Sequence, residues 1–339
     1  MIIWAGFLVL IVFLLAIDLG LLNRKAHVIP FKEAMRWTIL WVSISLLFTI
    51  PLYFLYKTHY MGFGYYGGQE LKASTAVLEY LTAYILEYSL SLDNIFLIAL
   101  IFAYFKVPAV YQHRLLFWGI LGALIMRGAM IALGAALIHR FEWITYVFGI
   151  MLLYTAFKLL RTQHEEIHPE NNPLFKLARR MFPVTPDYVE GRFFVRQSGK
   201  LFATPMFLVL VLVESTDVMF AIDSIPAVFG VTRDPFLVFT SNIFAILGLR
   251  SLFFVLAGVM NKFKYLEISL CVLLAFIGVK MLGAHWFKIP PHYSLAIIFV
   301  ILGIGVVASI IGNRRDASWE ALDKDEQGVP HPGPDDHGD

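Results

Sequence analysis

Residues 85–96 read ILEYSLSLDNIF and residues 213–229 read VESTDVMFAIDSIPAVF, two apolar segments that each contain carboxylates. Acidic side chains inside apolar segments are typical of membrane helices that face the interior of a bundle. The whole chain fits this pattern, since its 339 residues are 59% hydrophobic and 15% charged, with a mean hydropathy of +0.71. Soluble domains are roughly 45–50% apolar and about 25% charged. We therefore predict an all-α membrane protein and exclude an ordinary soluble enzyme.

Nine apolar blocks are long enough to cross the hydrocarbon core, which takes about 20 residues. They cover residues 2–22, 37–56, 80–105, 115–138, 143–160, 206–228, 236–259, 265–282 and 293–311. The first block has no basic residue before it and no small-residue cleavage site after it, so we predict a retained span rather than a secretory signal. The tail that follows the ninth block is acidic and rich in proline, and it is predicted to be disordered.

Basic residues in the connections predict the orientation of the spans. The connections after odd-numbered spans hold 18 Lys and Arg residues, whereas those after even-numbered spans hold 5. The positive-inside rule then places the N-terminus outside and the C-terminus in the cytoplasm.

The polar residues of spans three to five recur in the same order in spans six to eight, 122 to 130 positions later. The matched residues are Asp93-Asn94 with Asp223-Ser224, Arg127 with Arg250, and Lys158 with Lys280. Each unit has three spans, an odd number, so the second copy must be inverted relative to the first. Inverted repeats are typical of secondary transporters, whose substrate site lies at the repeat interface near the bilayer midplane.

These features divide the chain into six segments. They are two N-terminal spans with their loop (1–75), a first three-helix repeat (76–160), a cytoplasmic loop (161–205), a second repeat (206–285), a final span (286–313) and a disordered cytoplasmic tail (314–339).

Five carboxylates lie well inside the predicted spans: Glu87, Asp93, Glu214, Asp217 and Asp223. Without partners they would together cost roughly 15 kcal/mol, comparable to the whole stability of a typical domain. Together with Asp18 they outnumber the four bases of the spans by two, a balance that one divalent cation or two protons would cancel. They must therefore be paired, hydrated, protonated or bound to a cation.

Oxygen-rich sites suit hard cations such as magnesium, calcium and manganese(II). Glu214 and Asp217 are three residues apart and share a helix face. Pro226 lacks a backbone donor, so residues 223–226 are predicted to unwind and to add carbonyl oxygens. Alternatively, the charges only form ion pairs between helices; the excess of carboxylates favours the ion site. Asn242 is interpreted as a helix–helix hydrogen-bonding residue, with ligation as the alternative.

The connection 161–205 begins with HEEIHPE at residues 164–170 and continues with a basic patch around residues 176–180. We interpret HEEIHPE as a solvated polar loop, with a low-affinity metal-sensing site as the alternative. The net charge of +2 and the lack of a long basic tract exclude nucleic acid as a partner.

Several long motifs resemble the TerC family of integral membrane proteins, named for tellurium resistance, and above all its Alx-like members. The motifs are EYSLSLDNIF at 87–96, ATPMFLVLVLVE at 203–214, ESTDVMFAIDSIPAVF at 214–229, TSNIFAILGLRSLFF at 240–254 and GVKML at 278–282. The resemblance covers nearly the whole chain except the acidic tail. It implies manganese(II) export or homeostasis and a relation to the LysE-type exporter superfamily, which shares inverted three-helix units.

The resemblance carries over five acidic positions, with Asn94 and Ser224 as their neutral neighbours. We hypothesise a non-enzymatic exporter in the bacterial inner membrane that moves manganese(II) outward by alternating access, with no tightly bound cofactor. Its central ion site would comprise Glu87, Asp93, Asp217 and Asp223, with Glu214 as a further ligand or proton carrier. The bases that would balance the charge of the site are Arg127, Lys158, Arg250 and Lys280.

Two other functions are considered. One is a membrane partner that delivers manganese to secreted proteins, for which some family members are known, and which would bind the secretion machinery. The other is an intramembrane aspartyl protease using Asp93 and Asp223, but such enzymes need a GxGD context that neither LSLDN nor FAIDS supplies.

Overall fold

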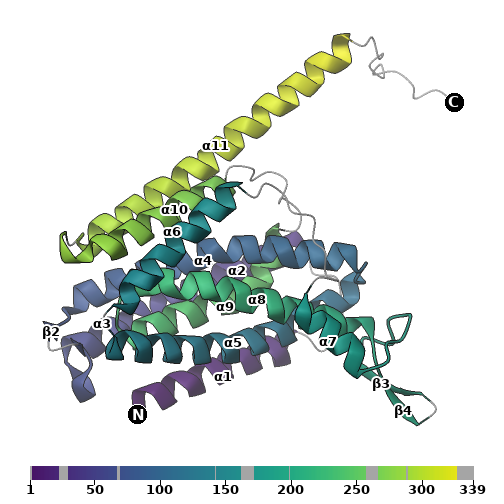
Figure 1. The fold of residues 1–339 in the computed structure, drawn as a ribbon, viewed down its shortest axis with the longest axis horizontal. Helices are drawn as coiled ribbons and strands as arrows, with labels where there is room; N and C mark the ends of the chain where they lie inside the picture. The colour runs from purple at the N-terminus through teal and green to yellow at the C-terminus, as the bar shows by residue number, and fades with distance from the viewer. Residues whose placement is uncertain are drawn as a thin grey trace.

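The computed structural model describes residues 2–22, 30–66, 69–141, 143–161, 172–197, 199–256, 266–287 and 289–326. Within these residues, eight helical segments are long and apolar enough to cross a membrane, and α1 adds a shorter apolar helix over Ile2–Ile17. They coincide with the nine predicted blocks, which confirms an all-α membrane protein (Figure 1).

The helices of the first half are α1 (Ile2–Leu22), α2 (Phe31–Leu47), α3 (Thr49–Lys57), α4 (Ala73–Tyr104), α5 (Ala109–Arg140) and α6 (Ile144–Arg161). Those of the second half are α7 (Pro173–Met181), α8 (Pro205–Phe229), α9 (Pro235–Leu256), α10 (Leu266–Leu282) and α11 (Pro291–Glu326). Helices α2 and α3 together form one span, Phe31–Lys57. The described residues also include two short 3-10 turns, η1 (Tyr60–Gly62) and η4 (Gly283–His285).

Two antiparallel hairpins lie in the connections. One pairs β1 (Tyr65–Tyr66) with β2 (Gln69–Glu70), and the other pairs β3 (Phe194–Gln197) with β4 (Lys200–Ala203). The second hairpin and α7 show that the predicted loop 161–205 contains ordered structure. Asn172 caps α7 by accepting hydrogen bonds from the backbone N–H groups of Leu174 and Phe175. The HEEIHPE stretch lies outside the described residues.

One prediction about local structure is wrong. Residues 223–226 do not unwind, because α8 is continuous with Pro226 inside it. Pro226 lies in the last turn, where few backbone bonds depend on it, and its carbonyl still accepts from the Gly230 N–H. Helix α11 extends to Glu326 and so overlaps the start of the tail that was predicted to be disordered, over the SWEALDKDE stretch, whose Ala, Leu, Glu and Lys favour helix. Residues 327–339 lie outside the described residues, and the disorder of the tail stays a prediction.

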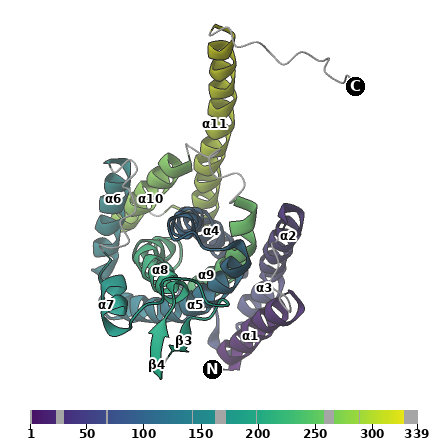
Figure 2. The same cartoon turned by 90° about the vertical axis from the view of Figure 1, so that its right-hand side faces the viewer.

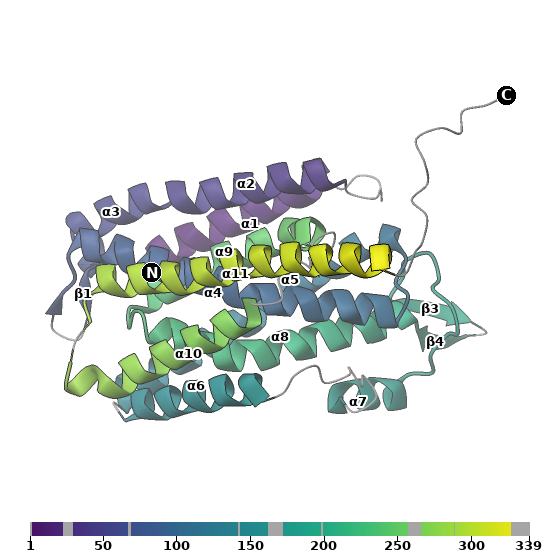
Figure 3. The same ribbon diagram turned by 90° about the horizontal axis from the view of Figure 1, so that it is seen from above.

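Four helices, α4, α5, α8 and α9, form the centre of the bundle (Figure 2). Helices α1 to α3 flank the centre on one side, and α6 and α10 flank it on the other (Figure 3). Helix α9 is the most enclosed, since 89% of its apolar window is buried, against 17% for the α2–α3 span and for α11. The polar residues of α9, such as Asn242 and Arg250, are therefore buried in protein.

Contacts between the two predicted repeats come in matched pairs. If α4, α5 and α6 correspond to α8, α9 and α10, then like helices touch in the pairs α4–α8, α5–α9 and α6–α10. The exchanged pairs α4–α9 and α5–α8 are both present as well. A two-fold relation between the units requires this pattern; the inversion itself stays a prediction.

Helices α6 and α10 approach closely at two glycines. A Cβ atom added to Gly278 would lie 3.0 Å from the carbonyl oxygen of Gly149, and one added to Gly149 would lie 3.2 Å from the carbonyl oxygen of Gly278. Small residues at such crossings let helix backbones pack directly against one another in membranes.

Candidate functional site

A buried arginine joins one carboxylate from each predicted repeat at the centre of the bundle. Arg127 on α5 forms ion pairs with Glu87 on α4 and with Asp217 on α8. The contact with Asp217 is bidentate, with Nη2 donating to Oδ1 over 2.9 Å and Nε donating to Oδ2 over 3.3 Å. Arg127 and Glu87 are 1% and 0% exposed, so water does not screen their charges.

Two neutral side chains cross between the repeats to the same carboxylates. Asn94 on α4 donates from Nδ2 to Asp217 Oδ1 over 2.9 Å, and Ser224 on α8 donates from Oγ to Glu87 Oε1 over 3.4 Å. Glu87 and Asp217 are 130 positions apart, as are Asn94 and Ser224. Each repeat therefore binds the other's carboxylate through an equivalent side chain.

Several buried oxygens at this centre have no hydrogen-bond partner among the described residues. They are Glu87 Oε2, Ser91 Oγ and Asn94 Oδ1. The three residues are spaced by four and three positions, so they line one face of α4. Buried polar atoms usually find a partner in protein, in water or in an ion. This face of α4 can therefore supply oxygen ligands.

Glu214 and Asp223 also lie on α8, but they contact residues other than Arg127. The Glu214 carboxylate rests against Gly122 of α5, where an added Cβ would collide with it. Asp223 accepts a 2.7 Å hydrogen bond from Thr155 on α6 and lies within the electrostatic reach of Lys158. Asp93 is partly buried on α4.

The five predicted carboxylates thus do not converge on one point. Glu87 and Asp217 share the arginine centre, together with Asn94 and Ser224, and the Glu87–Arg127 contact is an ion pair between helices of the kind considered as the alternative to an ion site. The described residues contain no group of three or more His, Cys, Asp or Glu side chains arranged to hold a metal ion. In this conformation Arg127 occupies the position between the two central carboxylates.

The four predicted charge-balancing bases have different positions. Arg127 is at the centre, and Arg250 is buried on α9. Lys158 interacts electrostatically with Asp223, whereas Lys280 interacts electrostatically with Glu79 of α4. The sequence pattern does not predict Glu79 as a site residue because the third apolar block begins at residue 80; the signal for it is a carboxylate one position outside that block.

Three further polar residues have hydrogen bonding that the sequence does not predict. Tyr56 donates to Asp234 over 2.7 Å, a bond across 178 positions that no local pattern indicates. Asp234 also accepts from the Phe236 and Leu237 N–H groups at the start of α9. Neither end of the buried Asn242 amide has a hydrogen-bond partner within the described chain, so the predicted helix–helix hydrogen bond is absent.

Comparisons with known proteins agree with this architecture. The model of the integral membrane protein TerC family matches residues 72–317. A Myxococcus xanthus protein named "Uncharacterized membrane protein STKORF319" is 47% identical over 94% of this chain and 95% of its own length. An Escherichia coli K12 protein named "Putative membrane-bound redox modulator Alx" is 44% identical over 92% of this chain and 95% of its own.

The Alx protein of Salmonella typhi is similarly related, with 43% identity over 94% of this chain and 97% of its own length. No solved structure matches the chain significantly. The family match covers well over half of the chain and includes the whole arginine centre. The chain therefore belongs to the TerC family of integral membrane proteins.

Proposed function

We propose that this protein exports divalent metal ions, with manganese(II) as the substrate, by alternating access across the bacterial inner membrane. The N-terminus would lie outside and the C-terminus in the cytoplasm. The observation that carries the proposal is the meeting of Glu87 and Asp217 at the interface of the two repeats. A substrate site at such an interface is what repeat-built transporters use.

The chemistry of the centre supports a hard cation as the substrate. Glu87, Asp217, Ser91 and Asn94 offer carboxylate, hydroxyl and amide oxygens, which manganese(II), magnesium and calcium all accept. Three of these oxygens have no partner in the described structure. An arriving ion would find ligands on α4 without breaking an existing hydrogen bond to them.

Arg127 gives this centre a resident positive charge. The two carboxylates carry two negative charges and the guanidinium returns one, so the pair is only partly neutralised. A divalent cation would neutralise it fully, but only where Arg127 has moved away from at least one carboxylate, because two cations repel strongly in a low-dielectric interior. Competition between Arg127 and the ion would couple ion binding to a change in helix positions.

Glu214 and Asp223 would contribute beside the centre, as further ligands or as proton carriers. Both are partly buried on α8, one turn before and almost two turns after Asp217. If protons replace the manganese(II) ion when it leaves, the negative charges of these carboxylates stay neutralised throughout the cycle.

Uptake of manganese(II) into inside-out membrane vesicles tests the proposal. Wild-type protein should load the vesicles, and Glu87→Gln and Asp217→Asn, which keep the side-chain shape, should reduce the rate at least about tenfold, a loss of about 1.4 kcal/mol. Calcium and magnesium as competitors would rank the ions. Glu190→Gln is the matched control, since Glu190 pairs with Arg192 on the surface of the α7–β3 connection.

Equal uptake by the wild type and both central variants would overturn the assignment of the centre. Manganese(II) binding by correctly inserted protein without any uptake would instead favour delivery of the metal to secreted proteins. Stable co-purification with the secretion machinery would then be expected.

A further inference from the structure

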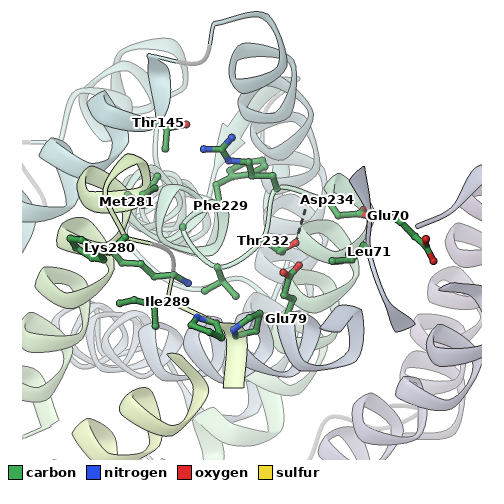
Figure 4. Close-up of a pocket in the computed structure, with 17 residues that line it drawn as sticks. Glu70, Leu71, Glu79, Thr145, Phe229, Thr232, Asp234, Lys280, Met281 and Ile289 are labelled. Carbon is green, nitrogen blue, oxygen red and sulfur yellow. Dashed lines mark hydrogen bonds between the residues drawn. The ribbon is translucent and has the colours of Figure 1, made fainter. Parts of the chain in front are cut away.

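A cavity of about 450 Å³ opens at one end of the bundle, away from the arginine centre (Figure 4). Its lining comes from β2, the first turns of α4, the α8–α9 connection, and the end of α10 with the segment after it. The charged residues among the lining are Glu70, Glu79, Arg233, Asp234 and Lys280. Acidic groups outnumber basic ones, so the cavity favours a cation over an anion.

The cavity lies at the end of the bundle that the charge distribution predicts to be external. Its lining belongs to the start of α4, the start of α6, the α8–α9 connection and the end of α10. These ends flank the connections that follow even-numbered spans, the ones poor in Lys and Arg. An ion leaving the cytoplasm would therefore reach this cavity last.

Helix α4 carries both Glu79 of the cavity and the oxygen-bearing side chains of the arginine centre. Glu79, Glu87, Ser91 and Asn94 are spaced by eight, four and three positions, and side chains at this spacing share one face of a helix. At 1.5 Å per residue, Glu79 lies about 12 Å along the helix from Glu87. Between them this side of α4 carries Ala83 and Leu86, which are fully buried in an apolar cluster.

The surroundings of Glu79 combine a balancing base with an unused hydroxyl. Thr232 lies beside the Glu79 carboxylate, and the Lys280 ammonium acts on it from α10 (Figure 4). Thr145, which also lines the cavity, is only 7% exposed, and its hydroxyl has no hydrogen-bond partner in the described residues. A buried, unpartnered hydroxyl at a polar cavity indicates that water or an ion binds there.

The size of the cavity and the number of its ligands point to a hydrated ion. Liquid water occupies about 30 Å³ per molecule, so there is room for an ion with its hydration shell. The described residues hold no group of three or more acidic, His or Cys side chains fit for direct chelation. Weak, water-mediated binding is what a release site needs, because an ion held tightly would not leave.

We propose that this cavity is an external release site, where a hydrated divalent cation arriving from the Glu87–Asp217 centre binds to Glu79 before it enters the outside solution. Lys280 neutralises Glu79 while the site is empty. The inference rests on the proposed export function and adds a second ion position to it.

Protection of an introduced thiol tests the site without requiring transport. In full-length protein carrying Cys271→Ala, the substitution Thr145→Cys places a thiol on the cavity wall at the cost of no hydrogen bond. A membrane-impermeant thiol reagent added outside spheroplasts should label it, and millimolar manganese(II) should slow the labelling at least about fivefold. Adding Glu79→Gln should remove the protection. Glu190→Gln, which lies outside the cavity in an exposed pair with Arg192, should keep it.

A second measurement needs no introduced thiol and leaves Cys271 unchanged. Electron paramagnetic resonance of manganese(II) added to purified protein counts bound ions, and Glu79→Gln should bind fewer than wild type and Glu190→Gln. Labelling without metal protection, absence of labelling from outside, or unchanged binding in Glu79→Gln would each overturn the release site.

The outcomes also separate this inference from the export function. Wild-type transport with no protection at the cavity would remove the release site alone. Protection that depends on Glu79, combined with no transport by wild-type protein, would leave a metal site but refute export.

Discussion

Arg127 is the residue on which the centre depends, because it supplies the positive charge beside Glu87 and Asp217. Arg127→Ala should destabilise the protein by about 3–5 kcal/mol, since removal of one partner leaves buried charge without compensation. The double substitution Arg127→Ala with Asp217→Asn should recover part of the loss, because one negative charge is then absent as well. Thermal unfolding of the purified variants in detergent measures both effects.

Arg192→Ala is the control for that comparison, since Arg192 forms an exposed pair that contributes little to stability. An Arg127→Ala protein as stable as wild type would show that the carboxylates do not need the guanidinium.

Asp223 lies apart from Arg127, so its part in export can be tested separately. Asp223→Asn should abolish manganese tolerance in cells that depend on this protein while the protein stays in the membrane, because the amide lacks the negative charge that an ion or a proton requires. Thr155→Val removes the 2.7 Å hydrogen bond to Asp223 but keeps its charge, and should leave most of the tolerance. Loss of tolerance in Thr155→Val alone would indicate a positioning role instead.

At the scale of helices, the closest packing is between α6 and α10 at Gly149 and Gly278. In Gly278→Val the added Cβ would lie 3.0 Å from the Gly149 carbonyl oxygen and 3.0 Å from Leu153 Cγ. Such atoms normally lie farther apart. We expect a loss of about 1–3 kcal/mol from overpacking, measured as a lower thermal midpoint. Gly303→Val on α11 is the control, because nothing lies within 4 Å of a Cβ there.

The start of α9 depends on Asp234, which accepts two backbone N–H groups and the Tyr56 hydroxyl. Asp234→Ala should cost about 1 kcal/mol through loss of the cap. Burial raises the pKa of the Asp234 carboxyl above its ordinary value of 3.8. The folded protein therefore holds this proton more tightly than the unfolded chain, and ionisation of the group costs stability as the pH rises through that range.

The pH dependence follows from that sign. The stability of wild type relative to Asp234→Asn, which has no titrating group, should improve as the pH falls toward 4 through the raised pKa. A difference in thermal midpoint that is the same at pH 4 and pH 7 would contradict the shift.

At the scale of the whole molecule, the topology places the two hairpins on opposite sides of the membrane. The charge distribution predicts that the β3–β4 hairpin lies in the cytoplasm and the α8–α9 connection outside. In a Cys271→Ala background, an impermeant thiol reagent added to intact spheroplasts should label Arg233→Cys and spare Lys200→Cys. Permeabilisation should make both reactive, and the reverse pattern would invert the predicted orientation.

The helices and their membrane character were determined by the sequence alone. Apolar blocks of about 20 residues can satisfy their backbone only as helices in lipid, and every predicted block coincides with a helix of the described structure. The order of Glu87, Asp93, Asp217 and Asp223 along the chain also predicted that acidic residues of two repeats would be buried. Both conclusions follow from local composition and spacing.

The tertiary structure decided which of those residues meet. It brought Glu87 and Asp217 to one arginine, directed Asp223 to α6, and placed Glu79 and Lys280 at a separate cavity. Spacing along a helix determines only the face on which a side chain lies, whereas the partner across that face depends on the rotation and depth of another helix. Those are set by packing over the whole bundle, for example at the α6–α10 glycines, and no local stretch of sequence contains them.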